Sequence, residues 1–99
     1  MNMTLKYNQE AAEGLAIQAL SFLAEDDERF GQFLALSGLD ASEIRAAASQ
    51  PGFLAGVLDH LVSDERMLIA FAEQSGLAPT EIAKAHSTLS GSGHFERGS

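Results

Sequence analysis

The sequence predicts an all-α protein, a compact bundle of about six short helices built from two related three-helix units at roughly 9–49 and 51–89. Apolar residues recur at intervals of three and four, which is typical of amphipathic helices. Acidic caps and glycine turns separate these stretches. The segment FLALSGLDASEIRAA at 33–47 also returns as FAEQSGLAPTEIAKA at 71–85.

The first predicted helix runs from Gln9 to about Ala24, after a disordered or frayed lead-in at 1–8. Asp26 is the expected N-cap of the second helix, because its carboxylate can accept hydrogen bonds from unpaired backbone N–H groups. Gly38 is expected to end that helix, since glycine adopts the left-handed conformation of a helix C-terminus without steric cost.

Asp40 is predicted to cap a short third helix, in which Glu43 completes a capping box. Ile44 and Ala47 are expected to form its buried stripe. Pro51 then opens the fourth helix, because proline fits a position whose N–H has no partner within the helix.

Asp64 is predicted to cap the fifth helix, and Gly76 to end it. Pro79 opens a sixth helix that is expected to end near Leu89. The remaining segment, 90–99, has too little apolar surface to offset its ordering entropy and is predicted to be a flexible tail.

The internal repeat supports two units within a single domain at 9–89. Residues 15–48 aligned with 53–86, without gaps and at an offset of 38, give ten identities in 34 positions. Most of the identities fall on caps, turns or predicted core positions, where the fold restricts the residue type. Two units are too few for a solenoid, so a closed bundle is expected.

Composition restricts the function. The chain has 99 residues, no cysteine and a net charge of −8, so disulfides and thiolate metal sites are excluded. The N-terminus lacks the pattern of a signal peptide and no apolar run could span a membrane, so we expect a cytoplasmic protein with no membrane partner. The negative charge repels nucleic acid, which is therefore not an expected partner.

Three segments resemble a family of small bacterial helical proteins catalogued as domain of unknown function 3572. They are Asp26 to Phe33, DDERFGQF, Ser37 to Arg45, SGLDASEIR, and Pro51 to Leu58, PGFLAGVL. The resemblance covers roughly Glu10 to Leu89 and implies a compact, all-helical cytoplasmic protein. It implies no site residues, because the family carries no established activity.

His60 and Asp64 are four residues apart, with Asp59 and Glu65 beside them, and could share a metal on one continuous helix. Asp64 is however the predicted cap of the next helix, and His60 aligns with Phe22 in the repeat. We therefore expect a packed or half-buried histidine.

The acidic run Glu25–Glu28 lacks the ligand spacing of a calcium loop and is interpreted as helix N-terminal charge. No nucleophile elbow, phosphate loop or zinc-protease motif is present. The sequence therefore predicts no enzyme, no cofactor and no metal.

A degenerate helix-turn-helix is the alternative function. Ala72, Gly76 and Ile82 have the spacing of its small packing residue, turn glycine and buried isoleucine. The main basic residues of the two candidate recognition helices are Arg45 and Lys84. Because a DNA reader must neutralise several phosphates, this sparse charge disfavours the alternative.

The favoured function is a non-enzymatic protein-interaction module that binds another protein or a second copy of itself. It is motivated by the absent catalytic motifs, the acidic surface and the apolar helical faces. Two apolar stretches, Ala46 to Phe53 and Met67 to Ala72, could form an exposed patch or belong to the core, and periodicity leaves both readings open.

Overall fold

The computed structural model of the chain describes the backbone of residues 2–98 and the side chains of residues 9–50 and 52–90. Within these bounds the chain forms six α-helices and no strand, which confirms the predicted all-α fold. The helices are α1 (Asn2–Ala24), α2 (Asp27–Ser37), α3 (Ala41–Ala47), α4 (Pro51–Val62), α5 (Glu65–Ser75) and α6 (Pro79–Gly98).

Helices α2 and α5 begin and end alike. Asp26 Oδ1 accepts hydrogen bonds from two backbone N–H groups of α2, at 2.9 and 3.2 Å. Asp64 Oδ1 accepts two from α5, at 3.1 and 3.2 Å. The residues after the two helices, Gly38 and Gly76, both have a φ of 77°. Each helix is thus bounded by a carboxylate cap and a left-handed glycine.

The starts of α3 and α6 also match. The backbone N–H of Asp40 donates to Glu43 Oε1 at 2.8 Å, and that of Ala78 donates to Glu81 Oε1 at 3.2 Å. In both cases a glutamate at the third helical position satisfies an N–H group just outside the helix. Local geometry therefore recurs at an interval of 38 residues.

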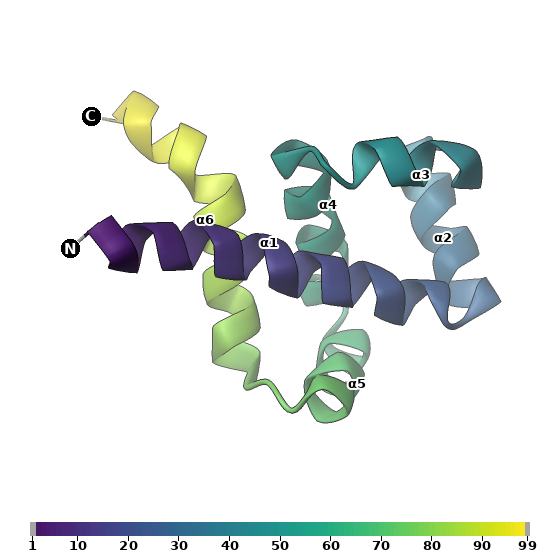
Figure 1. Cartoon of the computed structure of the whole chain (residues 1–99). Coiled ribbons are helices and arrows are strands. Elements are labelled where there is room, and N and C mark those ends of the chain that lie inside the picture. Colours follow the sequence, from purple (N-terminus) through teal and green to yellow (C-terminus); the bar gives the residue numbers. More distant parts are fainter. Residues whose placement is uncertain (1, 99) are drawn as a thin grey trace.

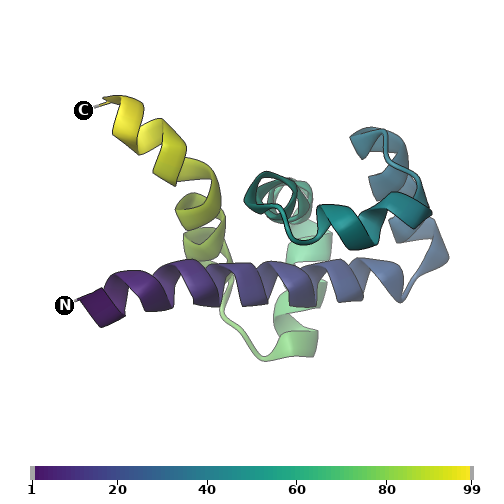
Figure 2. The same cartoon turned by 45° about the horizontal axis from the view of Figure 1, so that its top comes forward.

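The core lies where α1 crosses α4 and α6 (Figures 1 and 2). Its buried side chains come mainly from α1, α4, α5 and α6. The largest fully buried side chains are Phe71, Leu23, Leu58, Leu61, Ile82 and Val57.

Helices α2 and α3 lie together at the end of the molecule opposite the two chain ends (Figure 1). Of the eleven described residues of α2, Phe33 alone is buried. The predicted buried stripe of α3 is wrong: Ile44 and Ala47 are half-buried, and none of the seven described residues of α3 is buried. With only seven residues, α3 presents too short an apolar stripe to be enclosed by its neighbours.

Helix α6, the counterpart of α3 in the predicted repeat, behaves differently. It buries Ile82, Ala85 and Leu89 in the core that it shares with α1 and α4. The two predicted units thus match in their local turns and differ in how their third helices pack, and their relation as a repeat stays a prediction.

Helical backbone extends into the predicted lead-in at 1–8 and tail at 90–99, whose flexibility stays a prediction. Helix α1 already begins at Asn2, and α6 continues to Gly98. Once a packed segment has formed a helix, each further residue adds one backbone hydrogen bond. The side chains of 1–8 and 91–99 lie outside the described residues.

Within the described part of the chain, no helix has the combination of length and apolar character required to traverse a bilayer.

Candidate functional site

A hollow of about 330 Å³ lies between α2 and α4. We call it the α2–α4 notch. Its lining residues are Phe33, Leu36 and Ser37 of α2, Phe53, Gly56, Asp59 and His60 of α4, and Ser63 just after α4.

The wall of the notch is aromatic. Phe33, which is 4% exposed, reaches from α2 to two rings of α4. Its ring centroid lies 5.7 Å from that of Phe53 and 5.2 Å from that of His60, both in edge-to-face geometry. Phe53 and His60 stand on one face of α4 because they are seven residues, about two helical turns, apart. Phe33 thus connects α2 to α4.

Leu36 stands at the rim of the notch with 77% of its surface exposed. A single exposed leucine is ordinary on a protein surface. Here the leucine adjoins a hollow that is already lined by two phenylalanine rings, so exposed and recessed apolar surface are continuous at this point.

The polar groups of the notch are mostly engaged within the chain. Ser37 Oγ donates to the carbonyl of Leu34 at 3.1 Å, and Ser63 Oγ donates to the carbonyl of His60 at 2.9 Å. His60 Nε2 is buried and has no hydrogen-bond partner among the described residues. Such an unpaired atom lowers stability until something bonds to it.

The junction between α1 and α5 has both an aromatic contact and a polar bridge. There, Phe22 of α1 packs against Phe71 of α5 with ring centroids 5.3 Å apart. Gln74 Nε2 bridges the two helices by donating to both carboxylate oxygens of Glu25, at 3.1 and 3.2 Å. At an offset of 38 residues, the notch has His60, Phe33, Leu36 and Ser63 in these four places. Under the predicted repeat, the notch thus corresponds to the α1–α5 junction and lacks its polar bridge.

The change His60→Phe is expected to raise the free energy of unfolding by about 1–3 kcal/mol, because it removes a buried polar atom without a partner. Phenylalanine is the residue that stands at the equivalent position, Phe22. Thermal unfolding by circular dichroism measures the effect, and a gain of about 1 kcal/mol shifts the Tm by about 4–8 °C in a domain of this size.

The reverse exchange, Phe22→His, is the matched control for His60→Phe. Phe22 is 3% exposed, so the imidazole would be buried in place of an apolar ring and should lower the Tm. A lower Tm for His60→Phe as well would show that His60 is not under-satisfied in its site.

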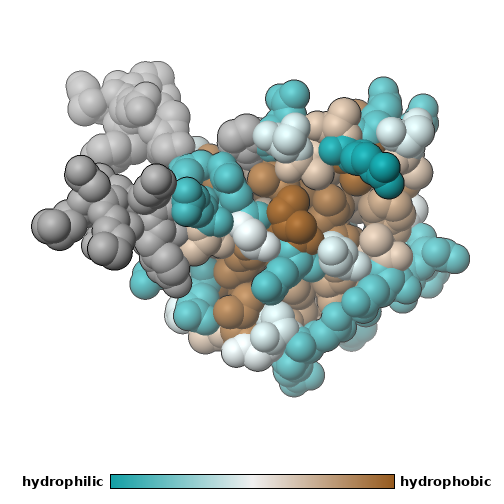
Figure 3. Space-filling view, in the orientation of Figure 1, coloured by the Kyte–Doolittle hydropathy of each residue, from teal (hydrophilic) through white to brown (hydrophobic). Residues whose placement is uncertain are grey.

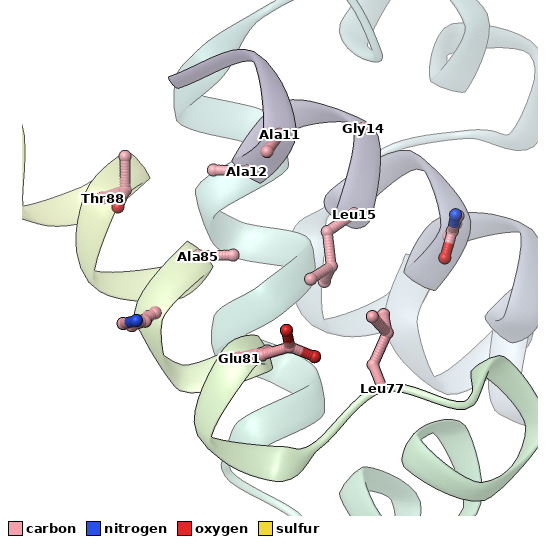
Figure 4. A pocket seen from close by; sticks show the side chains of 10 residues that line it. Ala11, Ala12, Gly14, Leu15, Leu77, Glu81, Ala85 and Thr88 are labelled. Carbon is pink, nitrogen blue, oxygen red and sulfur yellow. The ribbon is translucent and has the colours of Figure 1, made fainter. Parts of the chain in front are cut away.

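A second hollow, of about 450 Å³, lies between α1 and α6 (Figure 4). Leu15 of α1, Leu77 of the α5–α6 turn and Glu81 of α6 approach one another at one end of it. The small side chains of Ala12 and Ala85 line its middle. The carboxylate of Glu81 accepts the hydrogen bond at the start of α6, and Gln18, Lys84 and Thr88 also line this α1–α6 groove, so its surface is mixed polar and apolar.

The groove forms part of an apolar face. Figure 3 shows hydrophobic side chains on both sides of α1 at the centre of the face seen in Figure 1, surrounded by polar ones. Ile17 of α1 is 40% exposed. This face is a second surface that a partner could cover, although it holds no buried polar atom without a partner among the described residues.

A family model matches residues 9–92, and its family is described as a protein of unknown function, DUF3572. The chain belongs to this family. The match includes every residue of the α2–α4 notch and of the α1–α6 groove. No curated protein and no solved structure matches the chain.

In this DUF3572 chain, the basic residues considered for DNA binding lie on separate helices. Arg45 is exposed on α3, and Lys84 is exposed on α6 at the edge of the α1–α6 groove. The structure does not bring them together into one described hollow.

The residues considered as metal ligands each have a different structural role. Asp64 caps α5, His60 packs on Phe33, and Asp59 Oδ1 lies 3.3 Å from His86 Nε2. Among the described residues, no group of three or more histidine, aspartate or glutamate side chains is placed to hold a metal ion.

Sequence reasoning did not single out the notch. A usable signal was present in the repeat alignment. There, polar Gln74 is aligned with apolar Leu36, and apolar Phe22 is aligned with polar His60. Positions at which two otherwise similar units exchange polarity indicate surfaces with different environments.

Proposed function

We propose that this DUF3572 chain is a non-enzymatic protein-interaction module that binds a partner at the α2–α4 notch. The observation that carries the proposal is Leu36, 77% exposed beside a hollow that is lined by the rings of Phe33 and Phe53. A partner that covers Leu36 would remove this exposed apolar surface from water.

Most of the free energy of binding is expected to come from a few residues. Burying a leucine side chain contributes about 1.5–3 kcal/mol, which is roughly a tenfold to hundredfold change in affinity. Interfaces commonly depend on a few such residues that fill pockets near their centre. The notch has these features, with Leu36 projecting from its rim and Phe33 and Phe53 in its wall.

The same surface offers little support for catalysis. A general base needs a second group that orients it and a reacting group within hydrogen-bond reach. His86 and Asp59 are 3.3 Å apart, but the Asp59 side chain is 72% exposed. Solvent therefore screens the pair.

The test compares two substitutions of exposed aliphatic residues. Leu36→Ser changes the notch, and Ile69→Ser changes α5, where Ile69 is 45% exposed and lines neither hollow. We expect Leu36→Ser to weaken retention of a partner from cell extract by about tenfold or more, and Ile69→Ser to change it by less than about twofold.

Quantitative mass spectrometry of proteins captured on immobilised wild-type and variant chains provides the measurement. Equal thermal stability of the two variants is the control for folding. If no captured protein distinguishes Leu36→Ser from Ile69→Ser, the notch is not the binding site.

The second candidate is the helix-turn-helix formed by α5 and α6. It is favoured by the left-handed Gly76 between the buried Ala72 and Ile82, which follows the spacing of that motif. Its main exposed cation on α6 is Lys84, so phosphate-driven binding should be weak and should fall steeply with salt. Absence of DNA binding at low salt would exclude this candidate.

A further inference from the structure

We propose that the partner presents a basic amphipathic helix to the α2–α4 notch, with an apolar side chain against Leu36 and Phe53 and a Lys or Arg facing Asp59. This inference rests on the proposed function and adds the chemistry of the partner. Three features of the structure lead to it.

The first feature is the sign of the charge around the notch. Asp59 is the one carboxylate among the residues that line the notch; its side chain is 72% exposed, and its Oδ1 lies 3.3 Å from His86 Nε2. Arg29, the one basic residue of α2, turns toward α1: its guanidinium carbon lies 4.2 Å from the centroid of the Phe22 ring. A cationic side chain is therefore attracted to the Asp59 edge of the notch.

The second feature is the total charge, which argues against a second copy as the occupant. Each chain carries a net charge of −8, so two copies repel one another as their acidic faces approach. The same field accelerates encounter with a basic partner.

The third feature is the all-helical surface. Within residues 2–98 there is no strand, so an extended peptide would find no sheet edge with which to pair its backbone. A helix bonds its own N–H and C=O groups and presents side chains alone, which suits a hollow whose serine hydroxyls are already engaged.

The test titrates the full chain, labelled with nitrogen-15, with two synthetic peptides of about 18 residues, or five helical turns. One peptide has leucine on one face and lysine on the other, and the second has glutamate in place of every lysine. We expect the lysine peptide to shift the amide resonances of Phe33, Leu36, Phe53 and His60, and the glutamate peptide to shift none of them.

General attraction between opposite charges must be separated from docking at the notch. We expect Leu36→Ser to weaken binding of the lysine peptide by about tenfold, and Ile69→Ser to weaken it by less than about twofold. Charge attraction alone would be unaffected by either change, because neither alters the net charge.

Three results would overturn the inference: equal binding of both peptides, shifts confined to α5 or α6, or no effect of Leu36→Ser. If a Leu36-dependent protein is captured from extract and the lysine peptide still fails to bind, the partner's chemistry is wrong while the proposed function stands. If neither binds, both proposals are wrong.

Discussion

Phe71→Ala is expected to lower the free energy of unfolding by about 3–5 kcal/mol, since it removes a buried aromatic ring and leaves a cavity. Phe71 is 2% exposed, and its ring packs 5.3 Å from that of Phe22, so the substitution loosens α5 from α1. Small domains are stable by about 5–15 kcal/mol, so this loss is a large share of the total.

Urea unfolding followed by circular dichroism measures this loss. The urea concentration at the midpoint should fall, while the dependence of the unfolding free energy on urea concentration stays unchanged. Leu36→Ala is the control, because Leu36 is 77% exposed and its removal should change stability by less than about 0.5 kcal/mol. Similar losses for both variants would contradict the division between the core and the exposed rim of the notch.

Gly76→Val is expected to destabilise by about 1–3 kcal/mol, because a β-branched residue is strained at a φ of 77°. The turn at Gly76 leads into α6, which buries three residues in the core. Strain at this turn therefore displaces packed side chains as well as the local backbone.

Gly38→Val imposes the same strain, since Gly38 also has a φ of 77°. It should lower the Tm less than Gly76→Val, because α3 can shift without disturbing a buried side chain. Thermal unfolding of the two variants provides the comparison. Unchanged Tm values in both would rule out the left-handed turns.

The starts and ends of the helices were the most predictable features, because their signals are local. The Asp64 cap and the Glu43 side chain bond to backbone groups no more than three residues away. Gly76 needs only its own conformation to end α5. Such features are readable from sequence because no distant segment decides them.

The packing of α3 was less predictable. Ile44 and Ile82 occupy the same place in the repeat and have the same local pattern, yet Ile82 is fully buried and Ile44 is half-buried. The difference depends on whether α1 and α4 are near enough to cover the helix. That is a tertiary property, which helical periodicity does not contain.

The geometry of the notch could not be derived from the sequence for the same reason. The ring of Phe33 in α2 meets those of Phe53 and His60 in α4, which lie 20 or more residues away in the sequence. The exposure of Leu36 also depends on this placement. The sequence left open whether its apolar stretches were exposed or belonged to the core.

Site-specific photo-crosslinking tests the interaction site most directly. A benzoylphenylalanine at Gly56 would enter the α2–α4 notch, and one at Gly14 would enter the α1–α6 groove; a Cβ at either position meets no neighbouring atom within 4 Å. We predict that the probe at Gly56 crosslinks a partner protein in cells and that the probe at Gly14 does not. Crosslinking from Gly14 and not from Gly56 would contradict the assignment of the notch as the docking site.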